Sequence, residues 1–431
     1  MQPASLSWVD YVTQFVAALS VIFELCLSRR IPLLARRGMR LWALSPVKLR
    51  GTMAYQTDMD GPSYPAARTV ARRLEAAMAT AIALQNSEDV PRPDAATIEQ
   101  IVTTGFWASL RHEEGHAPKI SIAFLPPEQS VRPLKFDPRV RLDADLLVRI
   151  APAVEKPGIH IGVWSYDNKL HVWGITRTVP TWCFVLEVVG PGLLVVKYRR
   201  DGSSAKFANI AVLEGADVKF IERQPPMISE ASPALGSLSG FYSSAGRNES
   251  DNILVRVAIA MRAHGRGGSL LVVPRNTSRW LNSIVQPLTY SVIPPFPDIG
   301  TFLEQKEQGL QASTITLQSA VEALAGLTAV DGATVISDYF EPLAFGAKIV
   351  TGDSVHRVDR VLLTEPIEGV ADTTVDPAHL GGTRHLSAAQ FAHDQRDAIA
   401  LVASQDGRFT VFAWSSVHGM VHAHRLEALL I

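Results

Sequence analysis

The sequence predicts an α/β protein with more than one domain. In the C-terminal part of the chain, short apolar strands alternate with segments of helical periodicity, a pattern typical of an α/β sandwich. The middle of the chain instead carries a run of short alternating strands. A length of 431 residues, at about 150 residues per domain, indicates two or three domains. With 47% hydrophobic residues the chain can build sizeable cores, which excludes wholesale disorder.

The charge balance and the cysteine content limit the classes of binding partner and the cellular compartment that we expect for the protein. Lys and Arg number 41 against 42 for Asp and Glu, which gives a formal net charge of −1. A chain with this charge balance has no net positive charge with which to bind nucleic acid, so we expect no specific nucleic-acid partner. The two cysteines, Cys26 and Cys183, exclude a disulfide scaffold and a four-cysteine zinc site, and they favour a cytoplasmic protein.

Residues 1–52 are predicted to be a separate N-terminal extension. Its apolar stretch, 11–23, is bracketed by two acidic residues and is shorter than the ~20 residues of a membrane-spanning helix. A secretory signal fits poorly, because a basic leader and a small-residue cleavage site are both missing. The basic tract 29–50 has no acidic residue, so residues 11–50 could contact an anionic membrane surface peripherally. The alternatives are a docking helix and an untranslated extension before a true start at Met53.

Residues 53–245 are predicted to form an α+β domain. Its expected elements are helices over 64–84 and 95–110, a strand over 119–125 and a small antiparallel β unit over 159–222. Three tryptophans of this unit could line a ligand pocket, although burial in the core is the more common fate of tryptophan; they are Trp164, Trp173 and Trp182. A loop rich in Pro, Ser and Gly, residues 224–252, marks the domain boundary.

Residues 252–431 carry the alternating helices and strands. Helices are expected over 253–264, 313–327 and 388–395, and strands over 269–274, 331–337, 398–404 and 409–413. This order predicts a β-sheet flanked by helices. The glycine-rich segment of Gly265, Gly267 and Gly268 joins a helix to a strand, which is the wrong order for a phosphate loop, so we expect a tight turn there.

Two histidine patterns resemble metal sites only in part. The segment from His112 to His116 matches H-E-x-x-H, the pattern of a zinc hydrolase, which binds zinc only when both histidines share a helix face. Gly115 weakens a helix by about 1 kcal/mol and a proline follows closely, so a polar turn is expected and the zinc hydrolase stays an alternative. Near the C-terminus, His418, His422 and His424 cluster with no carboxylate or cysteine to complete a metal site, and we expect them to face solvent.

Two further segments predict a nucleotide site. Asp331, Gly332 and Ala333 place a carboxylate at a turn beside residues small enough for a ligand to approach the backbone. Such a carboxylate suits a divalent cation that phosphate oxygens also coordinate. Gly382, Thr383, Arg384 and His385 open a helix, where free N–H groups, a capping hydroxyl and basic side chains favour an anion. Metal and phosphate together are what nucleotidyl transfer requires.

In this order and spacing the motifs resemble the diadenylate cyclase (DAC, or DisA_N-type) domain of bacterial cyclic di-AMP synthases. The resemblance covers residues 252–431, from the helix before SLLVVP, through the DGA and GTRH motifs, to the strand that ends in V-A-S-Q-D at 402–406. Residues 60–245 resemble the sensor region, DACNV, that accompanies some DAC domains. The resemblance therefore implies a DAC-type mixed β-sheet preceded by a sensor-like α+β domain.

The resemblance also implies a reaction and its residues. Two ATP molecules, with Mg²⁺ or Mn²⁺, condense to cyclic di-AMP and two pyrophosphates across a head-to-head homodimer, under control of a small-molecule signal at the sensor domain. Asp331 would bind metal and help to activate the 3′-hydroxyl, and Asp406 would be a second metal ligand. The nucleotide itself would contact Gly332, Ala333, Gly382, Thr383, Arg384, His385 and Ser404.

One departure from the family pattern bears on activity. The family has R-H-R where this chain has Arg384, His385 and Leu386, and a lost charge-assisted contact is worth about 1.5–3 kcal/mol. If the contact forms in the transition state, the loss is about 10–100-fold in rate. Arg396 or Arg408 could substitute, and Val330 stands where some members carry a histidine. The alternative hypothesis is therefore a nucleotide-binding module that has lost turnover.

Overall fold

The computed structural model describes residues 63–83, 91–199, 207–222, 249–286, 289–293, 298–308, 314–350 and 357–431. The N-terminal extension 1–52, with its expected membrane contact at residues 11–50, lies outside the described residues. Most of the boundary loop 224–252 also lies outside them. Within the described ranges, no helix combines the length and the apolar character needed to cross a membrane.

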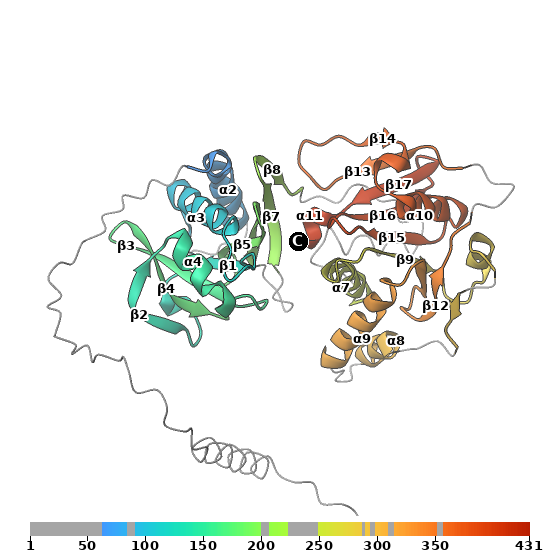
Figure 1. Ribbon diagram of the computed structural model, residues 1–431, viewed down its shortest axis with the longest axis horizontal. Helices are drawn as coiled ribbons and strands as arrows, with labels where there is room; N and C mark the ends of the chain where they lie inside the picture. The colour runs from blue at the N-terminus through green and yellow to red at the C-terminus, as the bar shows by residue number, and fades with distance from the viewer. Residues whose placement is uncertain are drawn as a thin grey trace, which may run out of the picture. The chain divides into compact units, whose positions relative to one another are not determined.

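The N-terminal half is built on an eight-stranded sheet with the order β2-β4-β3-β1-β5-β6-β7-β8 (Figure 1). Its helices are α2 (Pro65–Ala83), α3 (Ala95–Ser109) and α4 (Ala144–Ile150). Its strands are β1 (Ile120–Phe124), β2 (Leu134–Arg141), β3 (His160–Tyr166), β4 (Lys169–Thr176), β5 (Phe184–Gly190), β6 (Leu193–Arg199), β7 (Phe207–Glu214) and β8 (Asp217–Phe220). Asp94 caps α3, since its carboxylate accepts a hydrogen bond from the backbone N–H of Thr97 at 2.8 Å.

The strand pairs within residues 159–222 are antiparallel as expected, but these strands do not form a separate small unit. Strand β1 inserts between β3 and β5, parallel to the first and antiparallel to the second, so these strands belong to a larger mixed sheet. A parallel pair needs a long crossover, and the chain supplies it through β2 and α4, which the sequence analysis did not expect. Hairpin signals report only neighbours along the chain, so they could not show this insertion.

One face of this sheet packs against the helices. Leu74 of α2 and Ile98 and Ile101 of α3 are fully buried against Ile122 and Leu186 of the sheet. Among the three tryptophans, the indole N–H of Trp173 donates to the carbonyl of Leu125 at 2.8 Å, and Trp182 is buried. These two tryptophans are core residues, and Trp164 is partly buried against the same core clusters.

The C-terminal half is built on a nine-stranded mixed sheet with the order β10-β12-β11-β9-β15-β16-β17-β13-β14. Its helices are α7 (Glu249–Ala263), α8 (Asp298–Glu307), α9 (Thr314–Leu327), α10 (Thr383–Asp394) and α11 (Glu427–Leu430). Its strands are β9 (Gly268–Val273), β10 (Tyr290–Ser291), β11 (Ala333–Ser337), β12 (Pro342–Ala347), β13 (Val361–Thr364), β14 (Thr373–Val375), β15 (Ile399–Ala403), β16 (Phe409–Ser415) and β17 (Met420–Arg425).

Helices cover both faces of this second sheet, which confirms the α/β class. Alternate residues of β9 point to opposite faces: Leu270 packs in the core beneath α7, α8 and α9, whereas Leu271 packs in the core beneath α10. On the second face, Phe391 of α10 is fully buried against the sheet. Helix α10 begins at Thr383 and α7 at Glu249, earlier than the 388 and 253 expected.

Candidate nucleotide site

The candidate site lies where four strands of the second sheet begin or end. Strands β9 and β11 run parallel and start side by side, with Ser269 opposite Ala333. Strand β12 runs antiparallel to β11 and ends at Ala347, opposite Ala333. Strand β15 runs antiparallel to β9 and ends at Ala403, opposite Gly268. The loops at these strand ends therefore meet at one edge of the sheet.

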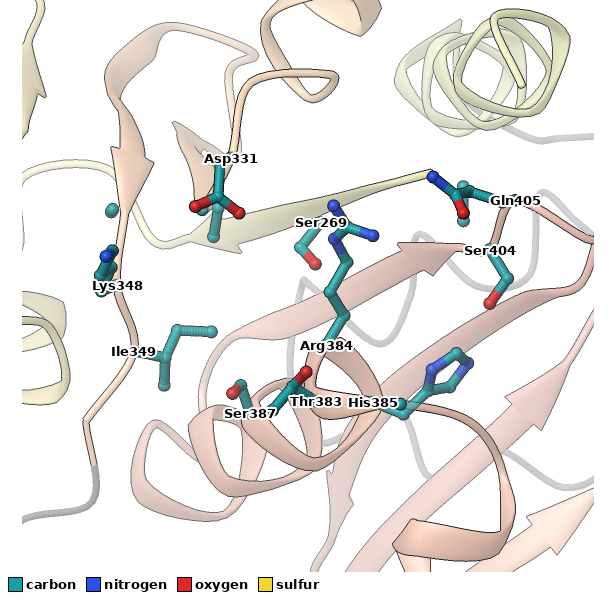
Figure 2. A pocket seen from close by; sticks show the side chains of 15 residues that line it. Ser269, Asp331, Lys348, Ile349, Thr383, Arg384, His385, Ser387, Ser404 and Gln405 are labelled. Carbon is teal, nitrogen blue, oxygen red and sulfur yellow. The ribbon is translucent and has the colours of Figure 1, made fainter. Parts of the chain in front are cut away.

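A cavity of about 620 Å³ opens at this edge and gathers both predicted motifs (Figure 2). It has the size of a small-molecule site, for which 300–1,000 Å³ is usual. It is lined by Ser269, Asp331, Gly332, Ala333, Ala347, Lys348, Ile349, Gly382, Thr383, Arg384, His385, Ser387, Ala403, Ser404 and Gln405. Every predicted site residue except Asp406 is in this set.

Asp331 is presented by a turn that only glycine permits. It precedes β11 by two residues, and its exposed carboxylate has no ion-pair partner within the described ranges. Gly332 has φ +105°, and a Cβ there would lie 2.5 Å from the carbonyl carbon of Gly346. The small residue expected beside the carboxylate is thus required by the close approach of the β12 backbone.

The start of α10 forms the opposite part of the lining. The expectation that Thr383 caps this helix was wrong, because Gly382 occupies the N-cap position and makes no side-chain capping bond. Thr383 is the first helical residue and lines the cavity. The amide dipoles of this 12-residue helix place partial positive charge at its N-terminus, which faces the cavity.

Arg384 extends from the first turn of α10 towards the loop before β9. A Cβ placed on Gly267, which has φ +69°, would lie 3.2 Å from Arg384 Nη1 and 3.1 Å from the carbonyl oxygen of Ala403. The glycine-rich segment is the expected tight turn between α7 and β9, and its missing side chain leaves room for this guanidinium. No carboxylate among the described residues pairs with Arg384.

His385 is buried, and its pKa is lowered. Burial is the main cause that lowers its pKa, and the positive charges of Arg425, Arg408 and Arg384 lower it further, against the opposing effect of Asp406. Its Nε2 is buried and has no hydrogen-bond partner among the described residues. A buried polar atom of this kind is costly unless a ligand or water satisfies it, so the ring is suited to bind a ligand group.

Asp406 does not line the cavity. It lies in the turn after β15, where its Oδ2 is 3.4 Å from Arg408 Nε and its Oδ1 accepts from the backbone N–H of Arg408 at 3.3 Å. Asp331 is therefore the one carboxylate among the lining residues. Within the part of the chain that the structure describes, no group of three or more His, Cys, Asp or Glu side chains could hold a metal ion.

The expected substitutes for the missing guanidinium lie elsewhere. The guanidinium of Arg396 stacks 4.1 Å above the ring of Trp414, and Arg408 pairs with Asp406. Neither residue lines the cavity, and Leu386 does not line it either. The cavity instead contains a cation that was not expected from the sequence, Lys348. It follows β12, whose residues PLAFGA do not alternate between apolar and polar, so this strand was not predicted.

The other histidine motifs give different outcomes. Glu113 and His116 hydrogen-bond through their backbones in both directions, and Gly115 has φ +85°, so H-E-x-x-H forms the expected polar turn and not a zinc-binding helix. The expectation that His424 faces solvent was wrong. Its Nδ1 lies 2.6 Å from Thr364 Oγ1, and full burial lowers its pKa to about 3. His418 is exposed, with its Nδ1 3.0 Å from Nε2 of the partly buried His422.

A comparison with protein families finds a match in the N-terminal half of the chain. Residues 87–177 match the family described as "Probable sensor domain DACNV". These residues, less than a quarter of the chain, are similar to that sensor domain. The match ends at residue 177 and does not include the cavity. No curated protein matches the chain. One similar solved structure is a hypothetical membrane spanning protein from Bacillus cereus, with 15% identity and a TM-score of 0.25, over 44% of this chain and 72% of that one.

Proposed function

We propose that residues 252–431 form a diadenylate cyclase that condenses two ATP molecules into cyclic di-AMP and two pyrophosphates. The observation that supports this most is the cavity itself. It combines the Asp331 carboxylate with the positive N-terminus of α10 and Arg384, although these motifs are some fifty residues apart in the chain. The sensor-domain match of residues 87–177 is independent support from the other half of the chain.

The ligand atoms of the cavity fit a divalent cation that is coordinated partly by the protein and partly by the substrate. Mg²⁺ is usually held by one or two carboxylates together with phosphate oxygens, and the lining offers the single carboxylate of Asp331. Bound there, Mg²⁺ or Mn²⁺ would neutralise phosphate charge and make the attacking hydroxyl more acidic. Because Asp406 is engaged with Arg408 outside the cavity, we assign the cation to Asp331 and the phosphates.

The side chains of the cavity would share the remaining work. The 3′-oxygen of one ATP bonds to the α-phosphorus of the other, the bond from that phosphorus to the bridging oxygen breaks, and pyrophosphate leaves with this oxygen. Asp331 orients the 3′-hydroxyl and takes its proton. The N-terminus of α10 and Arg384 bind the phosphate oxygens, where charge develops in the transition state. The unpaired Nε2 of His385 donates a further hydrogen bond to them.

Two further parts of the proposal concern assembly and control. Each cavity holds one ATP in this scheme, and the reaction joins two, so two chains must face each other as a homodimer. The N-terminal half would respond to a small-molecule signal and regulate this step in the cytoplasm, in keeping with its match to a sensor domain.

A second candidate is a nucleotide-binding module without turnover. Leu386, Arg396 and Arg408 are all absent from the lining, so the cavity contains a single guanidinium, that of Arg384. A site with fewer donors for the transition state can still bind a nucleotide while its reaction is slow.

The test is a cyclisation assay with ATP and Mn²⁺. The wild type is expected to release cyclic di-AMP and two pyrophosphates per product. Asp331→Asn should reduce the rate by about 100-fold or more, the usual contribution of a general base. Asp359→Asn, an exposed aspartate outside the lining, is the matched control and should leave the rate unchanged. ATP binding without product would favour the second candidate, and neither binding nor product would contradict both.

A further inference from the structure

Lys348 stands at a fixed position on the wall of the cavity. It follows directly after β12, and the backbone around it is held on both sides. Its carbonyl oxygen accepts from the N–H of Val285 at 2.8 Å, Ile349 pairs with Ile284, and the N–H of Val350 donates to Ser283 at 3.0 Å. The base of the Lys348 side chain is therefore anchored to the rest of the fold.

The ammonium of Lys348 is exposed and unneutralised. No carboxylate lies within ion-pair distance of it among the described residues. The two arginines considered above as substitutes already have partners: Arg408 pairs with Asp406, and Arg396 stacks on Trp414. An unpaired cation that lines a cavity is available to a ligand anion.

Lys348 and Arg384 approach the cavity from different places. The sheet order β12-β11-β9-β15 puts the end of β12 about three strand spacings, or ~14 Å, from the end of β15. Lys348 follows β12, whereas Arg384 lies beside Gly267, just before β9, and Ala403 at the end of β15. Figure 2 shows Lys348 on the side of Asp331, across the cavity from Ser404 and Gln405. The two cations therefore stand at separate positions on the wall of the cavity, so that a chain of phosphates can contact each of them at a different point.

We propose that Lys348 selects nucleoside polyphosphates over monophosphates by binding the phosphate chain at a second point, away from Arg384. This inference rests on the proposed nucleotide site and adds a residue and a preference to it. The position of Lys348 beside Asp331 also matters, because its charge offsets the repulsion between that carboxylate and phosphate. Lys348 is a binding and positioning residue in this scheme.

The experiment compares ATP, AMP and adenosine binding by calorimetry on the full chain, in EDTA so that no metal contributes. The variants are Lys348→Met, which keeps the length of the side chain, and Lys348→Arg, which keeps its charge. Lys156→Met, at an exposed lysine outside the cavity, is the control. Lys348→Met should raise the Kd for ATP by about 10-fold or more, the size of a charge-assisted contact, and change the Kd for AMP and adenosine by less than about threefold. Lys348→Arg should retain most of the ATP affinity.

Two results would overturn the inference alone: equal ATP affinity in the wild type and Lys348→Met, or an equal loss for ATP and AMP. A wild type that binds no adenine nucleotide would overturn the proposed function together with this inference. The Lys348→Arg and Lys156→Met proteins show whether any loss follows the charge at this position or a general effect on the fold.

Discussion

Gly332→Ala tests the claim that backbone geometry presents Asp331 to the cavity. Gly332 has φ +105°, and an alanine Cβ would lie 2.5, 2.7 and 2.8 Å from three backbone atoms of Gly346. Holding an L-residue in such a region costs about 1–3 kcal/mol. Forcing an extra carbon against packed backbone costs about 1–3 kcal/mol more, because no side-chain rotation can relieve the overlap. The expected loss of unfolding free energy is about 2–6 kcal/mol, a large part of the 5–15 kcal/mol usual for a folded protein.

Equilibrium urea unfolding measures this loss, and the matched control is Gly326→Ala. Gly326 lies in helix α9, where a Cβ would meet nothing within 4 Å. Alanine there should stabilise the protein by up to about 1 kcal/mol, since it is the better helix former. The two substitutions are chemically identical and should have opposite signs. A Gly332→Ala protein as stable as the wild type would refute the argument that the Asp331 turn requires glycine.

Two other predictions concern a pair of glycines and a buried histidine. Gly267→Ala should place a Cβ against Arg384 and weaken ATP binding. Gly265 has a similar positive φ, +65° against +69°, but a Cβ there meets nothing within 4 Å, so Gly265→Ala should leave binding unchanged. Equal ATP affinities of the two variants in a titration would contradict the role of Gly267. Burial lowers the pKa of His160 to about 4, below the 6.5 of the unfolded chain. As the pH falls, the unfolded state therefore binds a proton at His160 before the folded state does. The folded state loses stability between about pH 6.5 and about pH 4. The free energy of unfolding decreases by on the order of 3 kcal/mol over this pH range. The urea midpoint of His160→Asn should therefore fall less between pH 7 and pH 4.5 than that of the wild type. An equal fall in both proteins would contradict the role given to His160.

The sequence was sufficient for the fold class and for most of the residues that line the cavity, because both depend on local patterns. Apolar strands such as 269–273 and the helix before them are visible in the composition of a few neighbouring residues. The motif at Gly382–His385 is likewise short, and its helix begins within one residue of the predicted turn. The cavity joins this motif to Asp331, and the resemblance to a known domain supplied that pairing.

What the sequence did not reveal depends on contacts between distant segments. The place of β1 between β3 and β5 is set by pairing across about forty residues on one side and more than sixty on the other. Lys348 enters the cavity because β12 pairs with β11, and the sequence of this strand, PLAFGA, does not alternate between apolar and polar residues. His424 is buried by β13, which pairs with β17 from about sixty residues upstream. Periodicity within one segment carries no information about such partners.

The most direct test of the nucleotide site is an experimental structure with Mn²⁺ and an ATP analogue whose α,β-bridge is a methylene group. The proposed function predicts an anomalous Mn²⁺ signal within bonding distance of the Asp331 carboxylate. It also predicts phosphate density at the N-terminus of α10, in contact with Arg384 and with Nε2 of His385. Analogue and metal bound elsewhere, with this cavity filled by water alone, would contradict it.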